Sequence, residues 1–190
     1  MKRAALLVLV LSLVAAGCGG KPSPNGASSR KTPSPQTCAR FDGATDPQTS
    51  AGKPSQTMLL SALHVDSQAC FDRVILDFTR AKGEEPGYSV AYKPAAEAQT
   101  EDASGNHIPI AGKAFLVVRL EPAATADTSG ATLERTYTGP RTITPAGMHW
   151  VRQVSKTGDF EAVLTWAIGL SEKRPFKVTS EPSRLTIELG

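Results

Sequence analysis

From Thr57 onward, short segments of alternating apolar and polar residues recur between turn signals. Every second side chain of a strand points to the same face, so each segment predicts a strand with one buried face. The segments cover residues 58–65, 88–92, 114–121, 133–138, 160–170, 176–178 and 185–189. With the stretch 71–79 they make about eight short strands and leave no convincing long helix. This pattern predicts an all-β domain, an antiparallel β-sandwich, over residues 57–190.

Two of these segments carry the strongest patterns. Residues 160–170 hold six apolar residues in strict alternation, among them Trp166, which we therefore expect to be packed in the core. Residues 114–121 are apolar on both faces, which is typical of a strand that is covered on both sides. A short helical turn is expected after Pro94, where the chain becomes rich in Ala and Glu.

The stretch 71–79 is the densest apolar segment and fits two periods. As a helix, capped by Asp66, it places residues 71, 74, 75 and 78 on one stripe. As a strand it places Val74, Leu76 and Phe78 on one face and Ile75 on the other. Its β-branched and aromatic residues favour the strand, with its second face partly covered.

Residues 1–17 have the three parts of a secretion signal: a positive start at Lys2 and Arg3, an apolar run and a small-residue end. The run is shorter than the roughly 20 apolar residues of a membrane-spanning helix. Cys18 follows, and residues 14–18 resemble a bacterial lipobox, which implies a diacylglyceryl group on the Cys18 sulfur. We expect an exported protein, lipid-anchored at the extracytoplasmic face of the cell membrane through Cys18. Simple cleavage near Ala16, without lipidation, is the alternative.

Residues 18–56 consist mainly of Gly, Pro, Ser, Thr, Lys and Gln. Such a composition offers little apolar surface to offset the entropy of ordering, and so predicts a flexible, disordered tether. Cys38 and Cys70 remain once Cys18 is lipidated. In an oxidising compartment this pair is more often bridged than free, although Cys38 lies in a segment with no other sign of order.

The charge pattern argues against nucleic-acid binding. The 21 Lys and Arg and 18 Asp and Glu give a net charge of +3, which becomes +1 when Lys2 and Arg3 are removed with the signal. The three histidines, His64, His107 and His149, are far apart and form no metal motif. Nucleophile elbows and phosphate loops are also missing. The sequence therefore predicts a protein that is not an enzyme and has no cofactor or metal.

Aromatic rings and charged groups on outward strand faces are the residue types that bind sugars or peptides. The candidate ligand-binding residues are Arg73, Asp77, Tyr88, Tyr92, Trp150 and Arg184. On one strand Arg73 and Asp77 would be about 13 Å apart, too far for a direct ion pair. A purely structural role, with Asp72 and Arg73 in ion pairs at the sandwich edge, is an equally good interpretation.

Several short motifs occur together in one order: Phe-Asp-Arg-Val at 71–74, Pro-Gly-Tyr at 86–88, Gly-Asp-Phe-Glu at 158–161 and Pro-Ser-Arg-Leu at 182–185. With the strand around 112–120 they resemble the AMIN-like domain of actinobacterial secreted proteins and lipoproteins, over roughly residues 57–190. The resemblance implies a strand at 71–79 and a β-sandwich, since related AMIN domains are sandwiches associated with peptidoglycan.

These observations together predict a membrane-anchored, non-catalytic module. Its expected partner is peptidoglycan or another envelope component. The alternative is a module for protein–protein interaction or assembly at the outer face of the membrane, which would use an exposed sheet edge or patch.

Overall fold

The computed structural model describes residue 38, residues 40–80 and residues 83–190. The predicted signal peptide, the predicted lipidation site Cys18 and the tether up to residue 37 lie outside these residues. Within the described part, no helix is long and apolar enough to cross a membrane.

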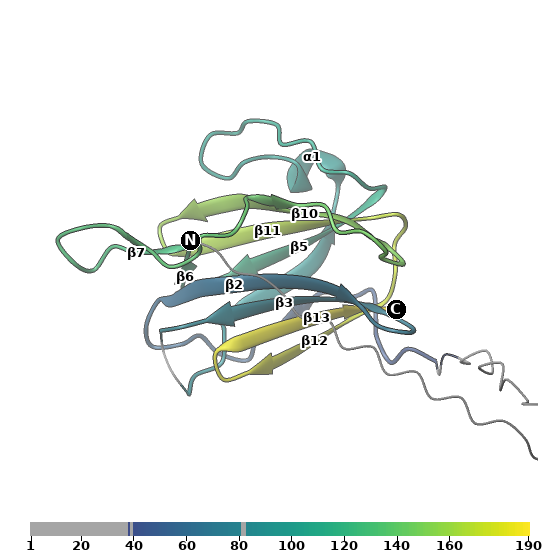
Figure 1. The fold of residues 1–190 in the computed structure, drawn as a ribbon, viewed down its shortest axis with the longest axis horizontal. Coiled ribbons are helices and arrows are strands. Elements are labelled where there is room, and N and C mark those ends of the chain that lie inside the picture. Colours follow the sequence, from purple (N-terminus) through teal and green to yellow (C-terminus); the bar gives the residue numbers. More distant parts are fainter. Residues whose placement is uncertain (1–37, 39, 81–82) are drawn as a thin grey trace, which may run out of the picture. The chain divides into compact units, whose positions relative to one another are not determined.

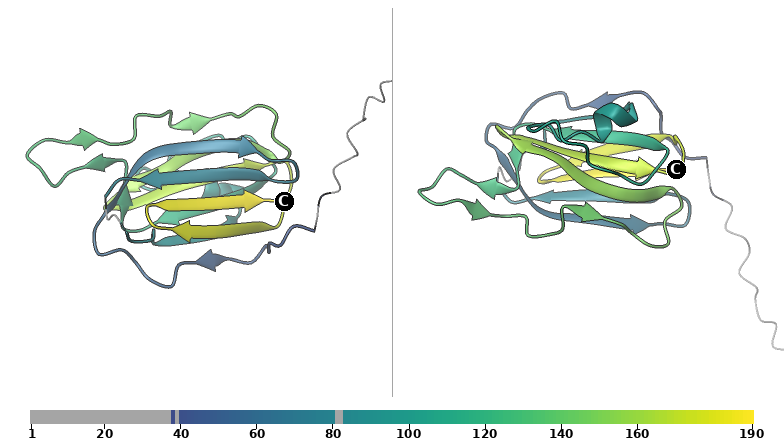
Figure 2. Two further views of the ribbon diagram at one scale, coloured as in Figure 1. Left: turned by 60° about the horizontal axis from the view of Figure 1, so that its bottom comes forward. Right: turned by 90° about the horizontal axis from the view of Figure 1, so that it is seen from above.

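Residues 40–190 form two β-sheets that stack as layers (Figures 1 and 2). The six-stranded sheet has the order β1 (Gln48–Thr49), β4 (Tyr88–Lys93), β5 (Ala114–Leu120), β11 (Val163–Leu170), β10 (Val151–Phe160) and β9 (Thr142–Ile143). The five-stranded sheet has the order β12 (Phe176–Glu181), β13 (Arg184–Leu189), β3 (Asp72–Phe78), β2 (Met58–Ser67) and β6 (Ala123–Ala124). A separate two-stranded ribbon consists of β7 (Ala126–Asp127) and β8 (Glu134–Arg135). Among the described residues there is one helix, the short α1 (Ala95–Ala98).

The predicted all-β sandwich is confirmed. In the described part of the chain, eight strands have six or more residues, and every pairing among them is antiparallel. The stretch 71–79 forms the central strand β3, in which buried and half-buried residues alternate along the whole length. Val74, Leu76 and Phe78 face the core, while Ile75 is half-buried on the other face. The helical alternative is therefore wrong, because the side chains follow a period of two.

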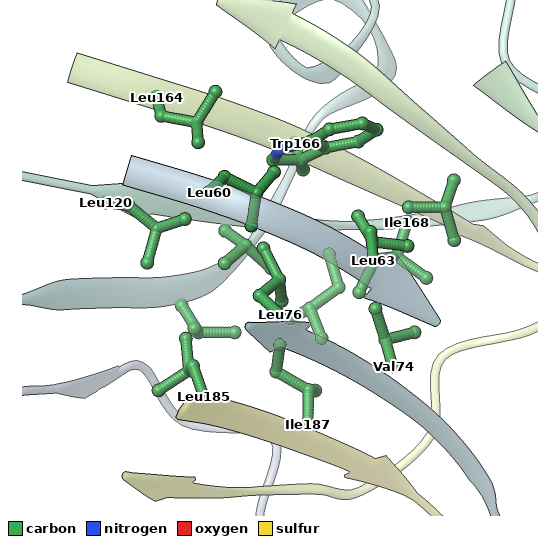
Figure 3. Packing of buried hydrophobic residues seen from close by; sticks show 14 of the residues in the cluster. Leu60, Leu63, Val74, Leu76, Leu120, Leu164, Trp166, Ile168, Leu185 and Ile187 are labelled. Atoms are coloured by element: carbon green, nitrogen blue, oxygen red, sulfur yellow. The ribbon is translucent and has the colours of Figure 1, made fainter. Parts of the chain in front are cut away.

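The core lies between the two sheets and draws large aliphatic residues from both (Figure 3). Leu76 and Ile187 come from the five-stranded sheet, and Leu120 and Leu164 come from the six-stranded sheet. Trp166 is 1% exposed and meets Tyr137 edge to face, with 5.6 Å between ring centroids. The prediction that Trp166 is packed is confirmed.

A second, smaller cluster covers the outer face of the six-stranded sheet. It brings Ala98 of α1 and Ile110 onto Phe115 of β5 and Ala167 of β11. Figure 2 shows α1 lying over this face. Strand β5 is therefore covered on both sides, as its continuous apolar pattern predicts.

The predicted strand 160–170 is wrong at its beginning. Phe160 ends β10, and Glu161 and Ala162 form the turn into β11, with positive φ angles of 51° and 57°. Tight hairpin turns of this kind usually carry Asn or Gly, so a Glu-Ala turn has no sequence signal. Phe160 and Ala162 continue the alternation of β11 by coincidence, and Phe160 lies on the surface.

Residues 40–56, here called the edge segment, run along one side of the sandwich (Figure 2). Gln48 bonds the edge strand β12 twice: its amide nitrogen donates to the Phe176 carbonyl at 2.9 Å, and its amide oxygen accepts from the Val178 N–H at 2.9 Å. Strand β1 pairs with β4 of the other sheet. The edge segment thus covers edges of both sheets, although its composition predicts part of a flexible tether.

A disulfide joins Cys38 to Cys70, with 5.5 Å between the Cα atoms. This is the bridge that the cysteine count favours. Cys70 lies in the turn between β2 and β3, and beside it Phe41 packs against Phe71 with ring centroids 6.2 Å apart. The bridge fixes the start of the described chain to the end of the sandwich where β2 ends and β3 begins.

Candidate functional site

Two large apolar side chains are exposed at the end of the sandwich opposite to the Cys38–Cys70 bridge. Leu133 is 62% exposed and Phe160 is 60% exposed, and no other large hydrophobic residue in the described ranges is exposed to this extent. Leu133 directly precedes β8, and Phe160 ends β10. Both line one cleft of about 460 Å³, here called the ribbon cleft, between the β7–β8 ribbon and the β10–β11 turn. A volume of this size is typical of ligand sites.

One wall of the ribbon cleft is held by the carboxylate of Asp159 on β10. It accepts hydrogen bonds from Lys156 Nζ at 2.8 Å, from the Thr125 N–H at 3.3 Å and from the Thr125 hydroxyl. Lys156 Nζ also lies 3.3 Å from the Thr125 hydroxyl oxygen. These contacts tie the loop after β6 to β10 and neutralise the Asp159 charge.

The opposite wall is held by Asp127 of β7. Arg80 donates to one carboxylate oxygen, and Ser129 donates to the other from its N–H at 2.9 Å and from its hydroxyl at 2.7 Å. The Asp127 charge is therefore also paired, and the base of the ribbon is fixed to the chain that follows β3.

The charged groups in the walls of the ribbon cleft are paired within the protein or lie at its surface. Asp127 and Asp159 are each engaged by a cation and by hydroxyl or amide donors. Over the described ranges, no group of three or more His, Cys, Asp or Glu residues could hold a metal. What the cleft offers a ligand is two exposed apolar side chains above walls in which Asp127 and Asp159 are paired.

Three of the six candidate residues predicted from the sequence lie on the outer face of the five-stranded sheet, in ion pairs. Arg73 binds Asp66 on β2 through two hydrogen bonds, of 2.9 and 3.2 Å, which hold the pKa of Asp66 below its ordinary value. Arg184 donates to Asp77 at 2.6 Å, and this hydrogen bond raises the pKa of Arg184. All of them already have protein partners across neighbouring strands, so they have a structural role here.

Tyr92 and Trp150 meet at one residue, Arg174, in the loop between β11 and β12. The Tyr92 hydroxyl donates to the Arg174 carbonyl at 2.7 Å and accepts from the Arg174 N–H at 3.0 Å. The Arg174 guanidinium lies 4.4 Å from the centre of the Trp150 ring. Burial raises the pKa of Tyr92. Both rings therefore hold a loop in place, and neither is fully exposed.

Tyr88 lies apart from the other five, half-buried at the start of β4. It lines a smaller hollow of about 280 Å³ beside Lys53 and Glu121, which form an ion pair of 2.7 Å. Desolvation raises the pKa of Tyr88. The six residues are thus divided among three regions of the surface, and none of them lines the ribbon cleft.

Asp72 is structural, as one interpretation of the sequence expects, but not through an ion pair at the sandwich edge. Its carboxylate is fully buried and makes no ion pair with a cation in the described part of the chain. It accepts instead from the N–H groups of His149, Trp150 and Val151 at 3.0, 2.7 and 2.8 Å, and from the Ser67 hydroxyl at 3.0 Å. Asp72 therefore links β3 of one sheet to the start of β10 in the other.

Sequence reasoning missed Leu133 and Phe160. Leu133 was assigned to an edge strand over 133–138, but only Glu134 and Arg135 pair, and they do so with β7 outside the main sheets. An isolated leucine between the polar loop 125–131 and a two-residue strand is the signal that could have identified it. Phe160 had no such signal. The turn at 161–162 contains no typical turn residue, so the pattern predicts that Phe160 belongs to a core strand.

One comparison with known proteins identifies a family. A family model described as AMIN-like domain matches residues 58–190, which is most of the chain and nearly the whole sandwich. No curated protein and no solved structure is significantly similar to the chain. The match covers all eight long strands and both walls of the ribbon cleft. The chain belongs to the AMIN-like domain family.

Proposed function

We propose that this protein is an exported lipoprotein, anchored through Cys18, whose non-catalytic AMIN-like domain binds cell-envelope material, with peptidoglycan as the first candidate. The observation that carries the proposal is the ribbon cleft, where Leu133 and Phe160 are exposed together above hydrogen-bonding walls. An exposed apolar pair of this kind commonly marks a binding site. The family supports the choice of ligand, since AMIN domains are associated with peptidoglycan.

The position of the disulfide favours a ligand in the cell wall rather than a lipid surface as the ligand. Leu59, near the start of β2, lines the ribbon cleft, and Cys70 follows the end of the same strand. Ten residues of strand at about 3.3 Å each separate the two ends by about 30 Å. Cys38 is therefore held at the end opposite to the cleft, and this position favours a ligand other than the membrane to which the chain is anchored.

A partner that adds a strand at β12 or at β4 has less support. Gln48 occupies the Phe176 carbonyl and the Val178 N–H of edge strand β12, and β1 covers β4. An added strand would need these same backbone groups.

Replacing both Phe160 and Leu133 by serine is expected to reduce retention on purified peptidoglycan sacculi by about tenfold or more, because central apolar contacts dominate most binding sites. Both side chains are exposed, so the fold should not change. Co-sedimentation with sacculi of the chain expressed without residues 1–17 and carrying Cys18→Ser measures the effect.

Thr179→Ala, an exposed change on β12, is the matched control and should be retained like the parent chain. If the folded parent is retained no better than a denatured control, peptidoglycan binding is wrong. Equal retention of the serine variant would place the site elsewhere, and release of soluble muropeptides during the incubation would contradict a non-catalytic role.

Replacing Cys18 by serine in the full chain is expected to move nearly all of the protein from the membrane fraction to the soluble exported fraction, because stable anchoring depends on the acyl chains. Incorporation of a labelled fatty acid should be lost with it. The Cys38→Ser/Cys70→Ser variant is the control, because it removes two cysteines and should keep both the label and the membrane fraction. A Cys18→Ser chain that still sediments with membranes would refute the lipid anchor.

A further inference from the structure

Each wall of the ribbon cleft carries one exposed apolar residue and, next to it, one exposed charge. On the ribbon these are Leu133 and Arg135, and at the β10–β11 turn they are Phe160 and Glu161. Neither Arg135 nor Glu161 belongs to an ion pair within the described residues, whereas Arg80 and Lys156 are paired with Asp127 and Asp159. The cleft thus presents a cation on one wall and an anion on the other.

The backbone at Glu161 points to a role beyond the turn itself. Glu161 and Ala162 both have positive φ angles, 51° and 57°, a conformation that Gly or Asn adopts with less strain. Strain of this kind is more common at functional sites than elsewhere. The Glu161 carboxylate has no ion-pair partner within the described chain that would explain why a glutamate occupies this position. The Glu161 residue borders the cleft beside the exposed Phe160 ring.

From this arrangement we infer that the ribbon cleft binds a zwitterionic peptide segment, in which a free carboxylate meets Arg135 and a free ammonium group meets Glu161. The apolar part of the segment lies between Leu133 and Phe160. A neutral sugar chain has no charges that could satisfy the two groups, so the inference assigns the peptide part of the ligand, and not its glycan, to this cleft. It rests on the proposed function and names the ligand chemistry of the same site.

The test is calorimetric titration of the chain without residues 1–17, carrying Cys18→Ser, with two probes. One is a synthetic tetrapeptide that contains a diamino acid with a free side-chain ammonium and carboxylate, and the other is a neutral tetramer of N-acetylglucosamine. The peptide is expected to bind, and the tetramer is not. Arg135→Gln and Glu161→Gln should each weaken peptide binding about three- to tenfold, and raised salt should weaken the parent chain in the same direction.

Lys177→Gln on β12 and Glu134→Gln on β8 remove exposed charges that do not line the cleft, and should leave peptide affinity unchanged. If the chain is retained on sacculi but binds the tetramer and not the peptide, the inference is overturned while the proposed function stands. Unchanged affinity in both cleft variants overturns it too. If the parent is not retained on sacculi at all, the proposed function fails, and the inference fails with it.

Discussion

Replacing Asp72 by alanine is expected to lower the free energy of unfolding by about 3–5 kcal/mol, a large part of the stability of an ordinary domain. The Asp72 carboxylate accepts three backbone hydrogen bonds from residues 149–151 and one from the Ser67 hydroxyl. Alanine would leave these donors without a partner at a buried site, which costs about 1–3 kcal/mol for each group that water cannot reach. The start of β10 would also lose its link to β3.

Asp77→Ala is the matched control, because Asp77 lies on the same strand with its side chain on the outer face. It pairs with Arg184, which is half exposed, so its loss should cost less than about 1 kcal/mol. Asp72→Asn keeps the shape but places an NH₂ group against N–H donors, and should lose about 2–4 kcal/mol. Urea unfolding followed by fluorescence of the two tryptophans measures all three variants. Equal losses for Asp72→Ala and Asp77→Ala would show that the buried carboxylate is not a structural link.

The sheets could be predicted from the sequence because a strand that is buried on one face has apolar residues at every second position. Val74, Leu76 and Phe78 show this in β3, and the double-sided pattern of residues 114–121 correctly predicts a strand covered on both faces. The ends of strands were less readable. The turn at Glu161 and Ala162 contains no Gly, Asn or Pro. The alternation of apolar and polar residues therefore continues across the turn, and it wrongly predicts that Phe160 is buried.

The candidate site was harder to predict, for a physical reason. Ion pairs and exposed aromatic rings look alike in a sequence whether they serve the fold or a ligand. Arg73 and Arg184 proved to be paired across strands, and Tyr92 and Trp150 to hold the Arg174 loop. The ribbon cleft, in contrast, brings together residues from chain segments that are far apart, and such a meeting depends on topology that no local pattern contains.

The attachment of the edge segment to the sandwich could not be predicted from the composition of the segment. Its contacts include backbone pairs, the two hydrogen bonds of the Gln48 side chain and the Lys53–Glu121 ion pair, none of which requires an apolar pattern. Composition therefore predicts a flexible tether for residues that lie on the sandwich. The one sequence signal of attachment is Cys38, which lies just before the segment and pairs with Cys70.

Removing the Cys38–Cys70 bridge is expected to cost about 3–4 kcal/mol of stability. The bridge closes a loop with a sequence separation of 32 residues, and the chain-entropy model assigns a stabilisation of this size to such a loop through the unfolded state. Urea unfolding of the Cys38→Ser/Cys70→Ser variant against the oxidised parent chain measures the loss. A reducing agent should lower the stability of the parent to the level of the variant and leave the variant unchanged. Equal stability of the oxidised parent and the variant would contradict the prediction.

The same variant separates stability from binding. The bridge lies about 30 Å from the ribbon cleft, at the other end of β2, and neither cysteine lines the cleft. Below its unfolding transition the variant should therefore keep the sacculus retention of the parent chain, whereas the Phe160 and Leu133 double variant should lose retention and keep its stability. A bridge variant that loses retention while still folded would mean that the binding surface extends to the edge segment, and the ribbon cleft alone would no longer account for the ligand.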